Sequence, residues 1–223
     1  MSSYSISLAI QIVSYLFSIV VIAIGWNKTR LLFETLWLEV GVNTIQLAWY
    51  VAAPFLFSQN PQGTFVDRAR AIPPFFRYLD WVVTTPLMLV TMLAVGSYAG
   101  DDPPRSLGAL FDHRRVVLFN ILLANLCMLA FGFAAEFFAL PKVTRTTLSL
   151  AGFLPFAYVW GTILIGFTDR ASGWTWALYL STCLFWAAYG VAAHFPWRAT
   201  AYNFLDAITK NVYSIIIGVT LLL

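Results

Sequence analysis

Seven apolar stretches dominate this sequence, and each is close to the roughly 20 residues that a helix needs to cross a bilayer. They cover residues 4–26, 31–57, 75–98, 115–139, 145–167, 172–195 and 200–223. Because hydrocarbon offers no partner to backbone polar groups, each stretch is predicted to be a helix. Only 10% of the residues are charged, against about 25% in a soluble domain. We therefore expect an all-α, multi-pass membrane protein, with residues 1–223 forming a single seven-helix domain.

The remaining charges exclude some classes of function. The formal net charge of +3 is spread among the connections, with no basic run of the kind that binds nucleic acid. Cys127 and Cys183 both fall in apolar stretches, which favours packing over a disulfide, and no metal site is expected. The first stretch is too long for a signal peptide and is interpreted as the first span. Lys and Arg slightly favour an N-terminus outside the cell, in the plasma membrane.

The last apolar stretch contains an acid and a base, Asp206 and Lys210, one helical turn apart. Residues at this spacing share a helix face. An ionised side chain near the bilayer centre costs about 2.5–3.5 kcal/mol on insertion scales. The other lysines, Lys28 and Lys142, lie at the ends of stretches, so Lys210 is the one lysine inside a predicted span. We expect the pair to interact and to have a function.

The third stretch carries a second intramembrane carboxylate, Asp80. Arg77, Asp80, Thr84, Met88 and Thr91 recur at steps of three and four, which places them on one helix face. Arg77 is expected to keep Asp80 ionised. The alternative is a structural ion-pair network that only fixes helix register. A buried lysine facing two carboxylates suits either a salt bridge or an imine formed with a carbonyl compound.

An imine-bound cofactor would need an aromatic slot. Aromatic side chains are available in three predicted spans, although such residues are more often ordinary packing; they are Trp81, Trp160, Trp186 and Tyr189.

The run RYLDWVVTTPLML, together with LDAITK in the last span, resembles the microbial (type I) rhodopsins over essentially the whole chain, bacteriorhodopsin-like or viral-rhodopsin-like. The resemblance implies a non-enzymatic light-responsive protein with all-trans retinal bound as a Schiff base on Lys210. It also implies Asp80 as counter-ion and proton acceptor, Asp206 as second counter-ion and Arg77 as a gating cation. Thr84 would help to orient the proton transfer to Asp80.

The resemblance also implies the walls of a retinal pocket. Trp81 and Trp186 would enclose the polyene, while Tyr189 and Tyr50 would hydrogen-bond to Asp206. The remaining implied pocket residues are Pro86 and Met88, the bridging pair Thr85 and Asn125, and the aromatic Trp160. Methionine at position 88 implies green absorption, and family habit implies trimers or pentamers in the lipid membrane.

Departures from the family pattern narrow the type of rhodopsin. Outward proton pumps resembling bacteriorhodopsin carry a carboxylate where this chain has Thr91, so the triad here is Asp80, Thr84 and Thr91. An acidic Asp80 disfavours chloride pumps, the triad disfavours sodium pumps, and Asp206 disfavours xenorhodopsins. The usual pair of outer carboxylates is not evident, and His194 and Arg198 stand there instead. An outward proton pump is the favoured prediction.

The second span offers a substitute for the missing carboxylate. Glu39, Asn43, Gln46 and Tyr50 repeat at steps of four, three and four. If Tyr50 lies near Asp206 as the resemblance implies, the helical rise places Glu39 about 16 Å further along the helix, in the cytoplasmic half and beside Thr91. Our hypothesis is that Glu39 reprotonates the Schiff base. The alternative is a glutamate that reaches the headgroups from a helix end, which Glu34 fits better.

Two other functions stay open. A polar stripe on the first span, Ser7, Gln11, Ser14 and Ser18, resembles the lining of channelrhodopsins, although polar residues are also common at ordinary helix contacts. A light-gated cation channel is therefore one alternative. A sensory receptor is the other, and it would need a separate transducer protein.

Overall fold

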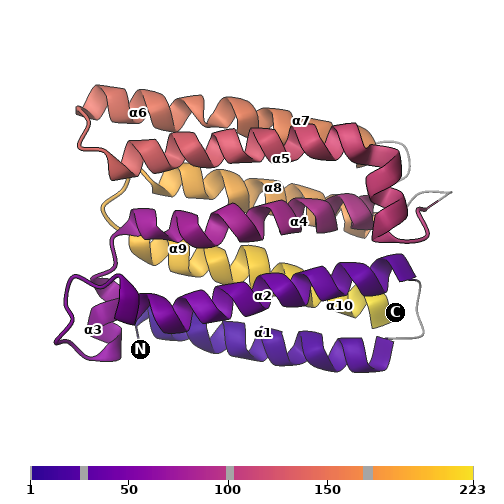
Figure 1. Ribbon diagram of the computed structural model, residues 1–223, viewed down its shortest axis with the longest axis horizontal. Helices are drawn as coiled ribbons and strands as arrows, with labels where there is room; N and C mark the ends of the chain where they lie inside the picture. The colour runs from indigo at the N-terminus through magenta and orange to yellow at the C-terminus, as the bar shows by residue number, and fades with distance from the viewer. Residues whose placement is uncertain (1, 26–29, 99–102, 168–172, 223) are drawn as a thin grey trace.

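The computed structural model describes residues 2–25, 30–98, 103–167 and 173–222. These residues form seven helical rods packed side by side (Figure 1). The first five rods are α1 (Ser3–Gly25), α2 (Arg30–Leu56), the 3₁₀ turn η1 (Pro74–Arg77) continued by α4 (Tyr78–Tyr98), α5 (Leu107–Phe137), and α6 (Lys142–Ala151) continued by α7 (Phe153–Phe167). The last two are α8 (Gly173–Ala192) and the composite rod α9 (Arg198–Asp206), η2 (Ala207–Val212) and α10 (Tyr213–Leu222).

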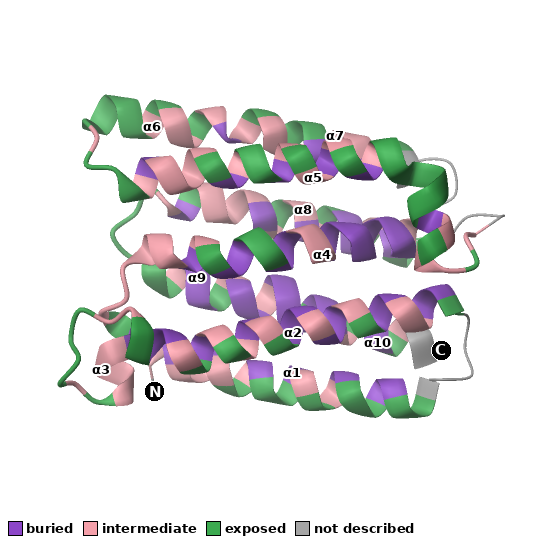
Figure 2. Cartoon of the chain, viewed as in Figure 1, coloured by how far each residue is buried: buried purple, intermediate pink, exposed green. Residues whose placement is uncertain are grey.

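Not every rod is apolar enough to be recognised as a span by itself. Within the described residues, four segments have the length and composition to cross a membrane: Ser3–Ile24, Pro74–Tyr98, Leu107–Phe137 and Lys142–Ile165. Among the others, α2 carries buried polar side chains that include Glu39, Asn43 and Gln46, and the last rod is divided into three shorter segments. Exposed residues lie mostly on the outward faces of the bundle (Figure 2), and many of them are large and apolar, as a lipid-facing surface requires.

The predicted spans and connections differ from the structure in three places. The helix expected at residue 115 begins at Leu107, where the Ser106 hydroxyl accepts a hydrogen bond from the Ala109 amide at 3.2 Å. Its φ of −117° and ψ of 16° at Arg114 mark a kink, and the continuous apolar run that led the prediction begins only after it. The single helix expected over 145–167 is divided at Gly152 into α6 and α7.

The third correction concerns the connection after the second span. It contains a short helix, α3 (Phe65–Arg70), which closes a capping box between Thr64 and Asp67. The predicted ends at residues 26, 172 and 223 lie outside the described residues.

Helix α4 is the central rod. In its apolar segment 67% of the residues are buried, against 22% in the segment of α5. It packs against α2, α5, α7 and α8. Polar side chains of its buried face are therefore held in the middle of the bundle, opposite the composite rod that carries Lys210.

The composite rod changes geometry at its functional residue. Residues Ala207–Val212 form a π-helix, which widens the turn around Lys210. Short π segments within helices are rare and are found frequently at functional sites.

Candidate functional site

Lys210 meets two carboxylates in the interior of the bundle. Its side chain extends from η2 towards α4, and its Nζ atom lies 2.5 Å from Oδ2 of Asp80. The same atom is 4.0 Å from Oδ1 of Asp206, one turn away on its own rod. All three residues are almost completely buried. The amine is thus paired mainly with the carboxylate of the facing helix rather than with its neighbour in sequence.

Asp206 is surrounded by hydrogen-bond donors from three other rods. Its Oδ2 accepts from Tyr50 Oη at 3.1 Å and from Arg77 Nη1 at 2.8 Å. Its Oδ1 accepts from Trp81 Nε1 at 3.2 Å and from Tyr189 Oη at 2.8 Å. These four donors give a buried carboxylate the charge-assisted hydrogen bonds that its ionised form requires.

Arg77 occupies a different position from the one that its spacing suggested. Its guanidinium hydrogen-bonds to Asp206, to Tyr50 Oη at 3.1 Å and to Oδ1 of Asn203, and none of its hydrogen bonds among the described residues reaches Asp80. Arg77 belongs to the 3₁₀ turn before α4, and its side chain extends towards α2 and α9. Among the described residues, the direct ionic partner of Asp80 is Lys210.

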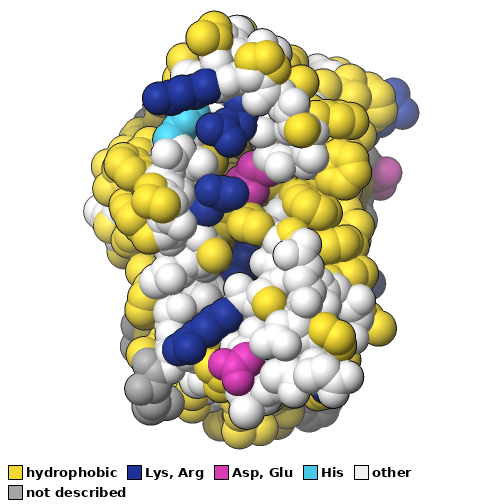
Figure 3. Space-filling model, turned by 90° about the vertical axis from the view of Figure 1, so that its left-hand side faces the viewer, with side chains coloured by type: hydrophobic (Ala, Val, Ile, Leu, Met, Phe, Trp, Pro, Cys, Tyr) yellow, Lys and Arg dark blue, Asp and Glu magenta, His cyan; other side chains and the backbone are white. Residues whose placement is uncertain are grey.

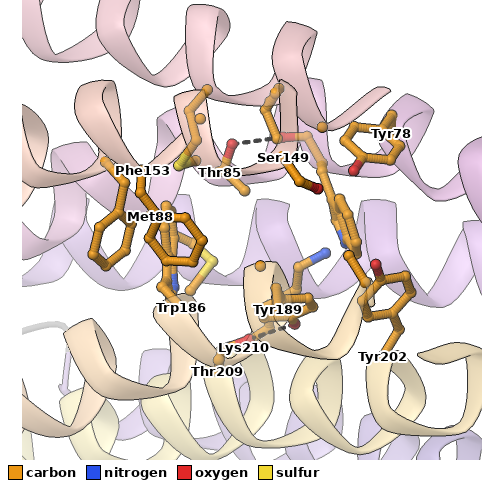
Figure 4. A pocket seen from close by; sticks show the side chains of 18 residues that line it. Tyr78, Thr85, Met88, Ser149, Phe153, Trp186, Tyr189, Tyr202, Thr209 and Lys210 are labelled. Atoms are coloured by element: carbon orange, nitrogen blue, oxygen red, sulfur yellow. Dashed lines mark hydrogen bonds between the residues drawn. The ribbon is translucent and has the colours of Figure 1, made fainter. Parts of the chain in front are cut away.

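An apolar cavity surrounds the amine, and Lys210 extends into it between Trp186 and Tyr202 (Figure 4). Six predicted pocket residues line it, namely Trp81, Thr85, Met88, Trp186, Tyr189 and Lys210. Side chains that the sequence did not single out complete the wall, among them Tyr78, Phe153, Phe156 and Tyr202. The wall also depends on glycine, since a Cβ on Gly190 would lie 2.5 Å from Cζ of Phe153.

Four predicted pocket residues do not line this cavity. Tyr50 lies with Arg77 and Asp206, and Pro86 lies within α4. Asn125 forms the predicted bridge to α4, donating from Nδ2 to Thr85 Oγ1 at 2.9 Å. The Trp160 ring stands behind Trp186, with 5.5 Å between ring centroids.

The chemistry of the cavity suits an apolar carbonyl compound that condenses with an amine. Its lining is aromatic and aliphatic, and it contains a single amine, which faces a buried carboxylate. Oδ1 of Asp80 has no hydrogen-bond partner among the described residues, so this carboxylate has acceptor capacity left for a charged nitrogen. Among those residues no group of three His, Cys, Asp or Glu side chains could hold a metal ion.

A second carboxylate site lies on α2, towards the other end of the bundle. Thr91 Oγ1 donates to Oε1 of Glu39 at 2.6 Å and lies 3.2 Å from the hydroxyl of Tyr213. Glu39 is fully buried, and its Oε2 has no partner within the described part of the chain. Glu34, by contrast, lies near the end of α2, where it pairs with Arg30 at 2.6 Å and accepts from the Leu107 amide at 2.7 Å. Glu39 is therefore an interior residue next to Thr91, and Glu34 is the helix-end residue.

Thr84 completes the triad on α4. It is fully buried, and its hydroxyl donates to the backbone carbonyl of Asp80 at 3.0 Å. This hydrogen bond is local to the helix, so Thr84 is held one turn from the carboxylate without a direct bond to it.

Sequence reasoning missed several polar residues of the interior. Tyr213 touches Thr91, and Glu136 accepts a hydrogen bond from Tyr202 at 2.6 Å. A signal was present for Glu136, because it is an acidic residue within the apolar run FGFAAEFF, like Glu39 in the second span.

Comparisons with known proteins agree with this geometry. The chain matches the family described as bacteriorhodopsin-like protein over residues 2–222. It is similar in structure to the viral rhodopsin OLPVRII, with a TM-score of 0.74, 21% identity, and coverage of 98% of this chain and 95% of that one. No curated protein sequence matches.

Two further solved structures are similar. One is a proton-pumping rhodopsin from the marine alga Acetabularia acetabulum, with a TM-score of 0.68, 19% identity, and coverage of 97% of this chain and 92% of that chain. The other is a bromide-bound halorhodopsin from Halobacterium salinarum, with a TM-score of 0.72, 15% identity, and coverage of 98% and 91%. The predicted all-helical, multi-pass membrane fold of seven helices is thereby confirmed.

Proposed function

The chain belongs to the bacteriorhodopsin-like protein family, and from this premise we propose that it is a light-driven outward proton pump that binds all-trans retinal on Lys210. Proteins of this family are transporters or receptors, and the chain is accordingly not an enzyme. The observation that carries the proposal is the buried 2.5 Å contact between Lys210 Nζ and Asp80 Oδ2.

The retinal would occupy the apolar cavity. Lys210 supplies the amine, and Trp81, Met88 and Trp186 supply walls. When bound as a Schiff base, retinal supplies the absorption of light and the isomerisation that starts transport. We keep the prediction of green absorption from Met88.

Protons suit the site better than anions do. The fold alone does not choose the ion, since the similar structures include both a proton-pumping rhodopsin and a halorhodopsin with bromide. A buried carboxylate next to the lysine nitrogen repels an anion and is placed to accept a proton from that nitrogen. Asp80 is therefore the proposed acceptor, and Thr84, one helical turn away, is proposed to help orient the transfer.

Glu39 is the proposed source of the returning proton. It is buried on the side of Lys210 that faces away from Arg77, and its one hydrogen bond among the described residues comes from Thr91. Thr91 has no acidic proton of its own to give, but it positions a carboxylic acid that does. We thus propose that α2 supplies the proton donor in place of α4.

The exit lies at the end of the bundle that carries the N-terminus, which we propose is outside the cell. A cavity of about 410 Å³ opens there and reaches Arg77 and Asn203. Dark blue Lys and Arg side chains are distributed over this end face (Figure 3). A proton leaving Asp80 would pass the Arg77–Asp206 pair into this cavity.

We further propose that residues 1–223 act as one domain and assemble as trimers or pentamers.

The test is the light-induced pH change in cells that express the protein and are supplied with retinal. Acidification of the medium that an uncoupler abolishes supports the outward pump. Alkalinisation contradicts it, and would indicate inward movement of protons. No change would also contradict it, and would leave a channel for other cations or a receptor with a separate transducer.

A light-gated cation channel is the second candidate, and one observation favours it. Polar side chains fill the contact between α1, α2 and the composite rod, where Ser18 meets Ser214 at 3.0 Å and Asn211 donates to Gln46 at 3.2 Å. Amide atoms of Gln11, Asn43, Gln46 and Asn211 have no partner among the described residues, which is the pattern that internal water satisfies. Photocurrents that reverse at the equilibrium potential of a cation would identify a channel, whereas a pump current keeps its sign.

A further inference from the structure

The cavity at the end of the bundle that carries the N-terminus collects groups that bind anions. Its volume is about 410 Å³, and its walls come from the starts of α1 and α9, from α2, α3 and η1, and from the connection that leads to η1. Two arginines, Arg70 and Arg77, are among its lining residues, and no described Asp or Glu lines it. Figure 3 shows Lys and Arg side chains in dark blue across this end face.

Arg77 has hydrogen-bonding capacity left inside the protein. Its side chain is only 10% exposed, and a guanidinium carries five N–H donors. The described hydrogen bonds of this group go to Tyr50, Asp206 and Asn203. At least two of its N–H groups therefore have no described partner, although the side chain borders the cavity. Because an unpaired buried donor is costly, an acceptor that enters the cavity from solution would be stabilised here.

Arg70 adds a second guanidinium to the same cavity. It is the last residue of α3 and is exposed. Asp67 is an acid that feels its charge, but the Asp67 carboxylate accepts its hydrogen bond from the Thr64 hydroxyl, at 2.6 Å. Arg70 is thus not neutralised by a direct ion pair with Asp67, and its charge remains available at the cavity.

Two helices begin at this cavity. The start of α1 contributes Ser2, Ser3 and Tyr4 to the lining, and the first turn of α9 contributes Ala199 and Thr200. The N-terminus of a helix carries a partial positive charge and amide groups without a partner inside the helix, and these features bind anions. Serine and threonine hydroxyls are further donors. Positive charge and hydrogen-bond donors from distant parts of the chain therefore meet in one place.

The same groups disfavour other occupants. Metal cations such as Ca²⁺ and Mg²⁺ prefer carboxylate and carbonyl oxygens, and two guanidinium groups would repel them. The cavity is also separate from the site around the lysine, since Arg77 lines it, whereas Asp206, Asp80 and Lys210 do not. Water alone is the remaining alternative, and it would leave the positive charge of Arg70 without a counter-ion.

We propose that this cavity binds a small inorganic anion between Arg70 and Arg77, with the N-termini of α1 and α9 and the Thr200 hydroxyl as further donors. The site goes beyond the proposed transport and does not depend on it, because every group that forms it is present in the dark. If protons leave through this cavity, the bound anion offsets the positive charge that they meet there. Chloride is the probe, since it is small and accepts hydrogen bonds from any direction.

Chloride-35 NMR of the purified protein, kept in darkness, measures this binding. Chloride bound to a slowly tumbling protein relaxes rapidly, so exchange with the site broadens the signal of free chloride. We expect an excess broadening that falls as added sodium bromide occupies the site, with sodium gluconate keeping the ionic strength constant. No excess broadening, or a broadening that bromide leaves unchanged, overturns the proposal.

Arg70→Gln removes one guanidinium without altering the network around Lys210. The affinity for chloride should fall by roughly tenfold or more, the loss expected for one charge-assisted hydrogen bond. Arg145→Gln is the matched control, because Arg145 is exposed on α6 at the same end of the bundle (Figure 1) and does not line the cavity. Equal losses in the two variants would show that chloride gathers around general surface charge. That result, or an unchanged affinity in Arg70→Gln, overturns the proposal.

Bromide provides a second measurement that needs no variant. In crystals of the unaltered protein grown with sodium bromide, anomalous scattering should place a bromide ion in this cavity, beside Arg70 and Arg77. Absence of that peak from an ordered cavity overturns the proposal. Absence of a light-driven pH change, by contrast, overturns the proposed transport and leaves both measurements of the anion site valid.

Discussion

Buried carboxyl groups in the two halves of the bundle have different hydrogen-bond surroundings. In the half nearer the N-terminus, Asp206 accepts four hydrogen bonds, one of them from the guanidinium of Arg77. In the other half, Glu39 accepts one hydrogen bond from Thr91 and has no described cation beside it. The first environment stabilises a negative charge through charge-assisted bonds, whereas the second favours the neutral acid. Lys210 lies between these two environments, which differ in the charge state of the carboxyl group that each favours.

Lys210→Ala removes the group that divides the two halves, and it should have the largest effect. Without the amine no Schiff base forms, so we expect complete loss of visible absorption after addition of all-trans retinal. Lys142→Ala, at the start of α6, is the matched control and should keep its colour. Colour that survives in Lys210→Ala would disprove the attachment site.

Asp80→Asn replaces the carboxylate that contacts Lys210. It replaces an acceptor of protons by an amide of nearly the same shape, so light-driven proton transport should fall by at least about 100-fold. Removal of a negative charge 2.5 Å from the nitrogen should also shift absorption to longer wavelength. Transport by cells and absorption of purified protein measure the two effects. Undiminished transport would show that another group accepts the proton.

Glu39→Gln removes the carboxylic acid from the half of the bundle farther from the N-terminus. The amide oxygen can still accept the hydrogen bond from Thr91. Recovery of the protonated lysine nitrogen after a flash should slow by roughly 10- to 100-fold. A small weak acid such as hydrazoic acid, added as azide, should restore the rate by carrying protons inward. Glu34→Gln is the control, since that residue is near a helix end and partly exposed. Recovery at the normal rate in Glu39→Gln would refute its role as donor.

The smallest expected effect is on the stability of α3, through its exposed carboxylate Asp67. Hydrogen bonds from the Thr64 hydroxyl and backbone lower the pKa of Asp67 below its usual value. Since the folded pKa is lowered, its contribution to α3 is present above about pH 4 and is lost as the pH falls through the lowered value. Amide hydrogen exchange in Phe65–Arg70, corrected for intrinsic rates, should therefore be slower in the unaltered protein than in Thr64→Val at neutral pH. The difference should vanish in acid, and a difference that persists there would contradict this account.

Several parts of the site could be predicted from spacing within one helix. The family resemblance placed Tyr50 beside Asp206, and the fixed rise and turn of a helix then placed Glu39 beside Thr91. The contact between Thr85 and Asn125 followed from the family resemblance. Partners on different rods were harder to assign, as Arg77 shows. Its spacing in the sequence predicted an interaction with Asp80. Its side chain instead extends across the bundle and hydrogen-bonds to Asp206.

The sequence by itself determined the membrane fold and the pairing of a buried lysine with carboxylates. Long apolar stretches allow only helices in hydrocarbon, and an isolated intramembrane charge is too costly to lack a partner. Only the tertiary structure decided that Arg77 hydrogen-bonds to Asp206 rather than to Asp80, and that Glu136 shares a buried site with Tyr202. Those outcomes depend on the rotation and depth of each rod against its neighbours, which are set by packing between residues far apart in the chain.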